Sequence, residues 1–477
     1  MNLRTAPWFV CVASALLVAT AQAGANRPNV VWFLVDDLGW ADLSCYGSSF
    51  YETPNVDRLA ASGVRFTQAY TPSPVCSPTR ASLLTGRHPV RVGITDWIPG
   101  MKAPRDARFE TVEHRSGLAL EETTIAELLR PHGYQTWYVG KWHLGGEGFD
   151  PTQQGFEVNI AGCHLGQPPS YFSPYRLPTL PDGPKGEYLE HRLVAEASRL
   201  LEQRDPTRPF FLYYASYNVH TPIHAAPGRV EHFRAKASQW PASPPAIPER
   251  RFRSRPRQDH PEYASMVAAM DDALGAILER IERMGLATNT IVVFTSDNGG
   301  LCTSAEVGPT CNLPLRSGKG WLYEGGIRVP LIIRAPGMRR GHVCDTPVWS
   351  PDLVPTVLEL CGLPLRPDLH ADGVSLVPLL RGDRSSPRTF YWHYPHYHGA
   401  GWTPGAAIRQ GPWKLIEFYE EERVELYDLD ADPGEQHDVA RAHPERVEQL
   451  RRRLREWQSE LHAPMPRANP AREAAAQ

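Results

Sequence analysis

Asn29–Val35, with the sequence NVVWFLV, is an uninterrupted apolar stretch that ends in two aspartates. A run of this length without alternating polar residues is typical of a parallel strand buried on both faces of a sheet. A second such run, Thr290–Phe294 (TIVVF), leads to Asp297 and Asn298. Because ligands bind beyond the carboxyl ends of the strands in open α/β sheets, these polar residues predict a site at one edge of the sheet.

Strand and helix patterns alternate along most of the chain. Further apolar runs predict strands at Thr136–Val139, Pro209–Ser216 and Val329–Ile333. Helices are expected at Pro54–Leu59, at Thr124–Leu129 and from about Met266 to Gly285. This alternation predicts an α/β fold in which helices cover both faces of a large mixed, mostly parallel sheet.

The pattern changes near residue 382, which suggests two domains of unequal size. Residues 24–381 contain the alternating strands and helices, and residues 382–477 are expected to form a smaller α+β subdomain. Its predicted elements are short antiparallel strands within Ala407–Phe418 and Val424–Leu429 and a charged amphipathic helix at Pro444–Leu461. Ser238–Gln258, rich in Pro, Arg and Ser, is expected to be a long surface loop.

The first 23 residues have the pattern of a secretory signal peptide. Arg4 supplies a positive charge, Phe9–Ala19 is a short apolar stretch, and Ala21–Ala23 fits a small-residue cleavage site. The alternative, a membrane anchor, requires a longer apolar stretch, and no later segment is long and apolar enough to cross a bilayer. We therefore expect a secreted or periplasmic protein without membrane insertion.

Composition limits the classes of partner. The chain has 477 residues, 42% of them apolar, and a formal net charge of −3. The apolar content suffices for a large core. Because the charge is nearly balanced and no long basic run occurs, nucleic acid is not expected as a partner. Any bound anion must be held by local cations.

Seven cysteines remain after the predicted leader, and they do not form a paired CxxC motif typical of zinc. If Cys76 is chemically consumed, six are left, an even number that could pair in an oxidising compartment. Cys302 and Cys311 could close a short loop, although connectivity cannot be deduced from sequence.

The segment Cys76–Arg87 (CSPTRASLLTGR) carries the most specific chemical signal. A helix is expected at Pro78–Thr85, so that Cys76 lies next to an amino terminus, where free N–H groups favour an anion. Arg80, one turn into that helix, could hold an anion by charge-assisted hydrogen bonds. The alternative interpretation is a buried free thiol with a surface arginine.

This segment resembles the signature of the type I, formylglycine-dependent sulfatases of the alkaline phosphatase superfamily, among them the arylsulfatases and N-acetylgalactosamine-6-sulfatase. Other segments resemble motifs of the same family in the same order: Val35–Gly39, Gly140–Gly145, Thr295–Gly299, Gly318–Gly320 and Glu425–Leu429. The resemblance implies an alkaline-phosphatase-like fold and hydrolysis of a sulfate ester. It also implies that Cys76 is oxidised to formylglycine by a separate formylglycine-generating enzyme.

Asp36, Asp37, Asp297 and Asn298 offer only oxygen ligands, which suit Ca²⁺ or Mg²⁺ better than zinc. Taken separately, the two aspartates could be a strand-end cap and the Asp-Asn pair a plain turn. The resemblance implies that all four are metal ligands, completed by the modified Cys76. We therefore expect one Ca²⁺ per chain, with Mg²⁺ as an alternative.

Four further side chains supply positive charge and proton transfer: Lys141, His143, His220 and Lys319. A lone histidine or lysine is more often structural or solvated. The assignment of these four residues to the site therefore rests on the resemblance. It implies that His220 and Lys319 assist departure of the alcohol and that His143 is the base for sulfate release. Lys141 and Arg80 would stabilise negative charge, and Asp297 would help to deprotonate the nucleophile.

A sulfated carbohydrate, from a glycosaminoglycan or another sulfated glycan, is the expected substrate. The polar aromatic run Trp392–His398 suits a sugar ring, although such residues are equally common at subdomain interfaces. His393 and His396, with His164 and Arg105, are the predicted sugar contacts. Two other functions stay open: a phosphonate or phosphate monoester hydrolase of the same superfamily, and a non-catalytic glycan-binding relative with an unmodified Cys76.

Overall fold

The computed structural model of the protein describes residues 27–470 and 472. The predicted signal peptide, residues 1–23, lies outside this described part. Within the described residues, no helix combines the length and the apolar composition that a membrane span requires.

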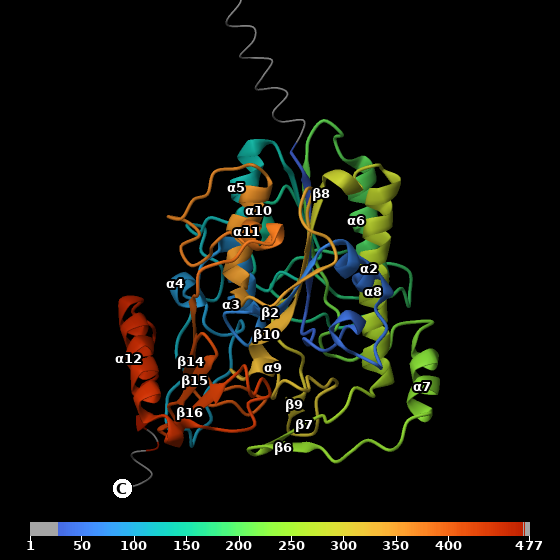
Figure 1. Ribbon diagram of the computed structural model, residues 1–477. Coiled ribbons are helices and arrows are strands. Elements are labelled where there is room, and N and C mark those ends of the chain that lie inside the picture. Colours follow the sequence, from blue (N-terminus) through green and yellow to red (C-terminus); the bar gives the residue numbers. More distant parts are fainter. Residues whose placement is uncertain (1–26, 471, 473–477) are drawn as a thin grey trace, which may run out of the picture.

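A nine-stranded mixed sheet forms the centre of the fold (Figure 1). In sheet order its strands are β11 (His342–Cys344), β2 (Val64–Tyr70), β10 (Arg328–Arg334), β8 (Thr290–Ser296), β1 (Asn29–Val35), β5 (Phe210–Ala215), β3 (Gln135–Gly140) and β4 (Val158–Ile160), with β12 (Val348–Trp349) paired to β2. Only β10 is antiparallel to its neighbours. The predicted mixed, mostly parallel sheet is confirmed.

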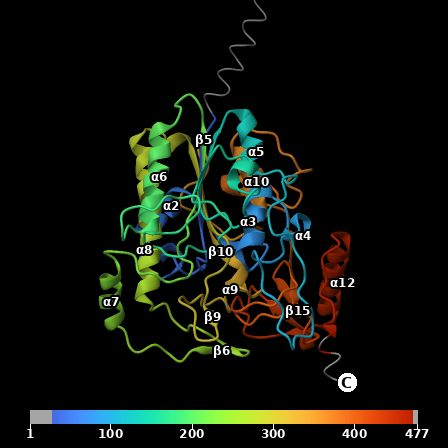
Figure 2. The ribbon, with the colours of Figure 1, turned by 180° about the vertical axis from the view of Figure 1, so that it is seen from behind.

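Helices cover both faces of this sheet (Figures 1 and 2). On one face lie α2 (Pro54–Ser62), α6 (Leu189–Gln203) and α8 (Pro261–Arg283). On the other lie α3 (Cys76–Thr85), α5 (Ile125–Leu129), α10 (Leu353–Leu360) and α11 (Val377–Arg381). Residues 31, 33 and 35 of β1 enter the first core, and residues 30, 32 and 34 enter the second, because successive strand side chains point to opposite faces.

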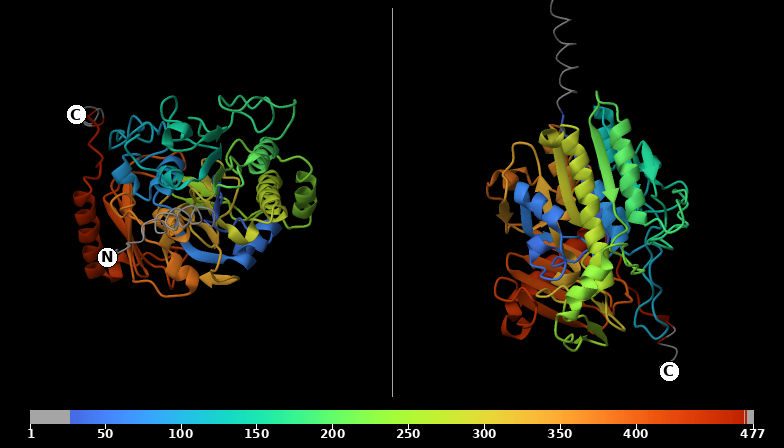
Figure 3. Two further views of the ribbon diagram at one scale, coloured as in Figure 1. Left: turned by 90° about the horizontal axis from the view of Figure 1, so that it is seen from above. Right: turned by 90° about the vertical axis from the view of Figure 1, so that its right-hand side faces the viewer.

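A four-stranded antiparallel sheet follows in the carboxyl-terminal part. It comprises β13 (Thr389–Tyr394), β14 (Gly405–Gln410), β15 (Trp413–Phe418) and β16 (Arg423–Asp428). One face contacts Leu450 and Leu454 of α12 (Pro444–Glu460), the outermost helix at the left of Figure 3. The other face contributes Trp392 and Tyr394 to an aromatic cluster with Trp321. The small sheet is thereby fixed to the large domain, although the domain boundary at residue 382 stays a prediction.

Three local expectations are corrected. The predicted loop 238–258 contains β6 (Ile247–Glu249) and β7 (Phe252–Ser254), which pair with β9 (Thr303–Ser304) in a small sheet. Helix α3 begins at Cys76 rather than at Pro78. Cys302 and Cys311 are free thiols, as are all cysteines within the described residues, and Cys302 Sγ instead contacts Thr303 Oγ1 at 3.4 Å.

Candidate active site

Four neighbouring strands end at one edge of the large sheet, and each is followed by polar residues of the predicted site. In Figure 1 the chain enters β1 from the top, so that this edge faces downward, toward the small antiparallel sheet. The residues are Asp297 and Asn298 after β8, Asp36 and Asp37 after β1, His220 beyond β5, and Lys141 and His143 after β3. Adjacent parallel strands thus bring together residues that are far apart in sequence.

Cys76 is the first residue of α3, and its Sγ atom lies 3.8 Å from Asp36 Oδ1. The thiol therefore lies where the helix presents N–H groups without intrahelical partners, a favourable position for an anion. Arg80, one turn later, donates from Nε to Asp297 Oδ2 at 2.8 Å and from Nη1 to the Lys141 carbonyl at 2.7 Å. Both side chains are buried.

Each of the three buried aspartates has its own cation. Lys141 Nζ donates to Asp36 Oδ2 at 2.7 Å, and Lys319 Nζ donates to Asp37 Oδ2 at 2.7 Å. Arg80 Nη2 lies 2.8 Å from Asp297 Oδ2. Buried charges are tolerated when they are paired and hydrogen-bonded, and here three negative and three positive groups balance. A divalent cation would give this cluster a net positive charge, which suits an anionic substrate.

The two adjacent aspartates lie in different electrostatic environments. Burial raises the pKa of Asp36 to about 8, and the carboxylates of Asp297 and Asp37 add to this effect, whereas Lys141 and Arg80 oppose it. Burial also opposes ionisation of Asp37, but Lys319 and His220 outweigh it and lower the pKa of that carboxyl group. Two neighbouring carboxylates cannot both stay ionised without such compensation.

Hydrogen bonds define the tautomers of both histidines. His143 Nε2 lies 2.5 Å from the Ile98 carbonyl oxygen and must therefore carry the proton, while Nδ1 is buried and has no partner among the described residues. His220 Nδ1 donates to the Thr221 carbonyl at 2.8 Å, and its Nε2 accepts from Lys319 Nζ at 2.9 Å. Burial, together with nearby Lys141, lowers the pKa of His143 well below its usual range, so that Nδ1 remains an acceptor.

Two site residues adopt a backbone conformation that is rare for residues other than glycine. Asp37 has a φ of 59° and His143 a φ of 56°. Residues in this left-handed region carry strain and cluster at functional sites. Here the conformation follows directly after the ends of β1 and β3, where it turns the two side chains toward the cluster.

The donor set fits a hard cation. Oxygen, sulfur or nitrogen atoms of Asp36, Asp37, Cys76 and His220 all lie within 4.8 Å of one another. Asn298 Oδ1 is buried without a hydrogen-bond partner, while its Nδ2 donates to Asp37 Oδ1 at 2.8 Å. A cation that prefers oxygen ligands would satisfy this unpaired buried oxygen beside carboxylates. Zinc would favour the thiol and the imidazole, but His220 Nε2 already accepts from Lys319.

A cavity of about 610 Å³ opens onto this cluster. Four of the predicted catalytic residues line it: Cys76, His143, His220 and Lys319. The remaining lining residues are Trp97, Ile98, Pro99, His164, Leu165, Gly166, Gln167, Leu301, Thr303, Ser304, His398, Gly399 and Ala400. The reactive end of the site is therefore accessible, whereas the ion pairs behind it are buried.

Only one of the predicted sugar contacts lines this cavity. His164 does so, whereas Arg105 is exposed elsewhere. His393 is buried against α12, where its Nε2 donates to the Pro464 carbonyl and Gln458 donates to its Nδ1. His396 is buried and lies 2.9 Å from Thr95 Oγ1. These environments indicate structural roles for both buried histidines.

His398, the last residue of the predicted aromatic run but not one of its named sugar contacts, lines the cavity instead. It follows the end of β13 and begins a turn in which Gly401 N–H donates to its carbonyl. The Gly-Ala-Gly sequence after His398 was the available signal, since glycines mark turns and turns at a strand end reach the site edge. Trp97 and Gln167 carry no comparable signal.

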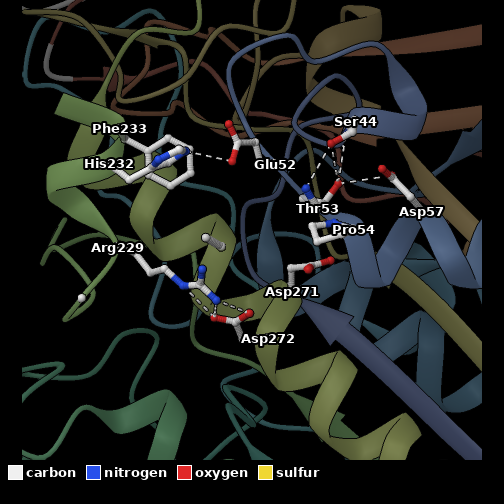
Figure 4. A pocket seen from close by; sticks show the side chains of 12 residues that line it. Ser44, Glu52, Thr53, Pro54, Asp57, Arg229, His232, Phe233, Asp271 and Asp272 are labelled. Carbon is white, nitrogen blue, oxygen red and sulfur yellow. Dashed lines mark hydrogen bonds and ion pairs between the residues drawn. The ribbon is translucent and has the colours of Figure 1, made fainter. Parts of the chain in front are cut away.

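A second cavity, of about 540 Å³, lies between α2, α8 and α7 (Val230–Ser238) and is shown in Figure 4. Two ion pairs lie in its lining, Arg229 with Asp272 and His232 with Glu52, and Asp271 accepts hydrogen bonds from the start of α2. None of the residues that line it belongs to the predicted site. Among the two cavities, only the first is lined by residues of the predicted site.

Comparison with known proteins now identifies the family. The family model described as Sulfatase matches residues 28–363. This chain belongs to the sulfatase family. A second model, described as N-sulphoglucosamine sulphohydrolase, C-terminal, matches residues 317–462.

This sulfatase is similar over most of its length to characterised relatives. Human arylsulfatase A is 34% identical, with 91% of this chain and 89% of the relative covered. Human N-acetylgalactosamine-6-sulfatase is 31% identical, with 91% and 85% covered. The solved structure of Ps i-CgsB in complex with k-i-k-neocarrahexaose superposes with a TM-score of 0.72 at 27% identity, covering 90% of this chain and 92% of that one. The protein is a sulfuric ester hydrolase, and the predicted family is confirmed.

Proposed function

We propose that this sulfatase removes sulfate from a carbohydrate by means of a formylglycine derived from Cys76 and one bound Ca²⁺. The observation that carries the proposal is the position of Cys76 at the amino terminus of α3, on the wall of the cavity and 3.8 Å from Asp36. A formylglycine-generating enzyme would be the maturation partner. The aldehyde hydrate would supply one hydroxyl to attack sulfur and a second to expel sulfate.

The metal would be held by Asp36, Asp37, Asp297 and Asn298 together with the modified Cys76. Asn298 Oδ1 needs no rearrangement to accept this role because it has no hydrogen-bond partner among the described residues. When bound, the cation would orient the nucleophile and polarise the sulfate oxygens. Mg²⁺ could take the place of Ca²⁺, since the ligands alone do not fix the ion size.

The remaining side chains divide between the two halves of the reaction. Lys319 and His220, joined by a hydrogen bond of 2.9 Å, would protonate or stabilise the departing alcohol. His143 would be the base in sulfate release, and its free Nδ1 acceptor supports that role. Lys141 and Arg80 would stabilise negative charge at the sulfate, and Asp297 would help to deprotonate the attacking hydroxyl group.

A carbohydrate is the proposed alcohol component. The cavity combines apolar side chains with polar, hydrogen-bonding ones such as His164, Gln167 and His398, as sugar sites do. The relatives include N-acetylgalactosamine-6-sulfatase and a structure in complex with k-i-k-neocarrahexaose, but also human steryl-sulfatase at 29% identity. Export to a secreted or periplasmic location, where sulfated glycans occur, is part of this proposal.

The test is mass spectrometry of the peptide that contains Cys76, combined with turnover of sulfate, phosphate and phosphonate monoesters. We expect the aldehyde form of Cys76, preference for sulfate esters, and loss of turnover in Cys76→Ala. Cys344→Ala, which removes another buried thiol in β11, is the matched control and should stay active. An unmodified thiol without turnover would instead support a non-catalytic glycan-binding protein. Hydrolysis of phosphonate or phosphate monoesters faster than of sulfate esters would support a phosphonate or phosphate monoester hydrolase.

A further inference from the structure

The walls of the catalytic cavity are nearly free of fixed charge. Among the described residues that line it, Lys319 is the single lysine, arginine, aspartate or glutamate. Its ammonium group already donates to Asp37 at 2.7 Å. The three aspartates of the cluster, Arg80 and Lys141 do not line the cavity. The wall therefore has no unpaired cation that could receive a carboxylate or a second sulfate of the substrate.

Side chains of two other kinds make up the rest of the wall. The apolar lining includes Trp97, Ile98, Pro99, Leu165, Leu301 and Ala400, and the polar lining away from the reactive cluster includes His164, Gln167, Ser304 and His398. Apolar surface with a few oriented polar groups suits a ring that has apolar C–H surface and hydroxyl groups.

His398 offers a hydrogen-bond donor of fixed orientation. Ala400 N–H donates to His398 Nδ1 at 3.1 Å, which leaves the proton on Nε2. The ring lies directly against Gly320, where a Cβ atom would be only 2.0 Å from Nδ1. Burial, reinforced by nearby Lys319, lowers the pKa of His398 to about 3, so that the imidazole stays neutral. It can donate to a hydroxyl oxygen but supplies no positive charge.

We propose that the cavity selects the sulfate ester of an uncharged, hydroxyl-bearing ring, and that His398 Nε2–H is a specificity-determining donor to that ring. This inference rests on the proposed function and narrows its substrate class. A carboxylate or a second sulfate on the same ring would lose water without gaining a cation, and burying an unpaired charge is strongly unfavourable. Singly sulfated neutral sugars should therefore be preferred to sulfated uronic acids and to disulfated amino sugars.

The first test compares kcat/KM for 4-nitrophenyl sulfate, singly sulfated galactose and N-acetylgalactosamine isomers, a sulfated uronic acid and an N,O-disulfated glucosamine. We expect at least one neutral sugar to exceed both charged sugars by tenfold or more. Equal or faster turnover of a charged sugar would overturn the inference and leave the sulfatase mechanism intact. No turnover of any sulfate ester by formylglycine-containing protein would reject the proposed function itself.

The second test changes His398. His398→Ala should lower kcat/KM for the neutral sugar by about three- to tenfold, the loss of one hydrogen bond, mainly through KM. The loss on 4-nitrophenyl sulfate should be smaller, because that substrate lacks ring hydroxyls. His398→Gln, whose amide can still donate a hydrogen bond, should recover part of the kcat/KM that His398→Ala loses on the neutral sugar. Equal losses on both substrates would show that His398 is structural.

The third test adds charge to the wall at Gln167, which is exposed at the cavity. Gln167→Lys should raise the ratio of kcat/KM for the sulfated uronic acid over the neutral sugar by about two- to fivefold, the size of an exposed charge pair. Gln167→Glu, the matched control of opposite sign, should lower this ratio. A ratio that does not respond to either change would contradict a role for wall charge in selectivity.

Discussion

Lys141 Nζ donates a hydrogen bond of 2.7 Å to Asp36 Oδ2, and both side chains are fully buried. The pair joins the ends of β3 and β1, which are separated in the sheet by β5. Because neither group can reach water, removal of one partner leaves a buried charge poorly compensated, and Asp36 would then keep Arg80 Nη2, 3.5 Å from its Oδ1, as a weaker partner. The same ion pair therefore stabilises the two strand ends and fixes the positions of two site residues.

Lys141→Met should lower the free energy of unfolding of metal-free protein by roughly 3–5 kcal/mol and abolish turnover. Urea denaturation with EDTA present measures the first effect. The double variant Lys141→Met, Asp36→Asn removes both charges and should recover much of the stability but none of the activity. A single variant as stable as the wild type would show that another group neutralises Asp36.

Metal removal should abolish activity, and Ca²⁺ should restore it, because oxygen ligands cluster here and Asn298 Oδ1 has no hydrogen-bond partner among the described residues. Asn298→Ala should lower both turnover and the amount of bound metal, which elemental analysis measures. Asn289→Ala, at the opposite end of β8, is the control and should retain both. Unchanged metal content in Asn298→Ala would exclude its amide oxygen as a ligand.

The sheet edge could be predicted from sequence because uninterrupted apolar runs define buried parallel strands, and the polar residues beyond them must then meet. Asp36 after β1 and Asp297 after β8 are the clearest cases. Lys319 lies in a loop, and only the resemblance to a family placed it at the site. Its contact with Asp37, a residue far away in the sequence, is made only in the folded chain, and no local sequence pattern predicts it.

The substrate side of the cavity could not be predicted in the same way. His393 and His398 belong to one aromatic run, but the docking of α12 decides that His393 is buried against Gln458. The turn after β13 decides that His398 faces the cavity. Histidine tautomers depend on single carbonyl groups such as that of Ile98, which sequence alone does not reveal.

The effect of replacing Lys319 on turnover should depend on the leaving group of the substrate. In Lys319→Met, turnover of a sugar sulfate should fall by roughly a hundredfold or more, since an alkoxide needs a proton as it departs. The loss on 4-nitrophenyl sulfate should be smaller because nitrophenolate leaves without help. Comparison of kcat/KM on the two substrates measures this, and a purely structural role of the Lys319–Asp37 contact would reduce both equally.

Stability should decrease in mild acid partly through His393. Burial lowers the pKa of His393 from 6.5 to about 4, so that the unfolded chain binds a proton more readily than the folded one. The contribution of neutral His393 to the free energy of unfolding is therefore complete above pH 6.5. It is lost as the pH falls toward 4, by about 3 kcal/mol in total. Urea midpoints of wild type and His393→Gln between pH 7.5 and 4.5 should diverge accordingly, and parallel curves would contradict the assignment.

The orientation of His143 depends on a neighbouring glycine in the cavity wall, Gly166. A Cβ atom at Gly166 would lie 2.6 Å from His143 Cε1 and 2.7 Å from Nε2, the atom that donates to Ile98. Gly166→Ala should therefore displace the imidazole and reduce kcat by roughly ten- to a hundredfold, because small misplacements of catalytic groups are costly.

Gly146→Ala is the matched control for this change. Its Cβ atom would meet nothing closer than His164 Cβ at 3.5 Å, an ordinary contact. We expect both variants to unfold at similar temperatures and only Gly166→Ala to lose activity on 4-nitrophenyl sulfate, a substrate too small to depend on the outer wall. Retention of full kcat in Gly166→Ala would show that the His143 ring can move without loss of function, and the role proposed for its Nδ1 atom would then fail.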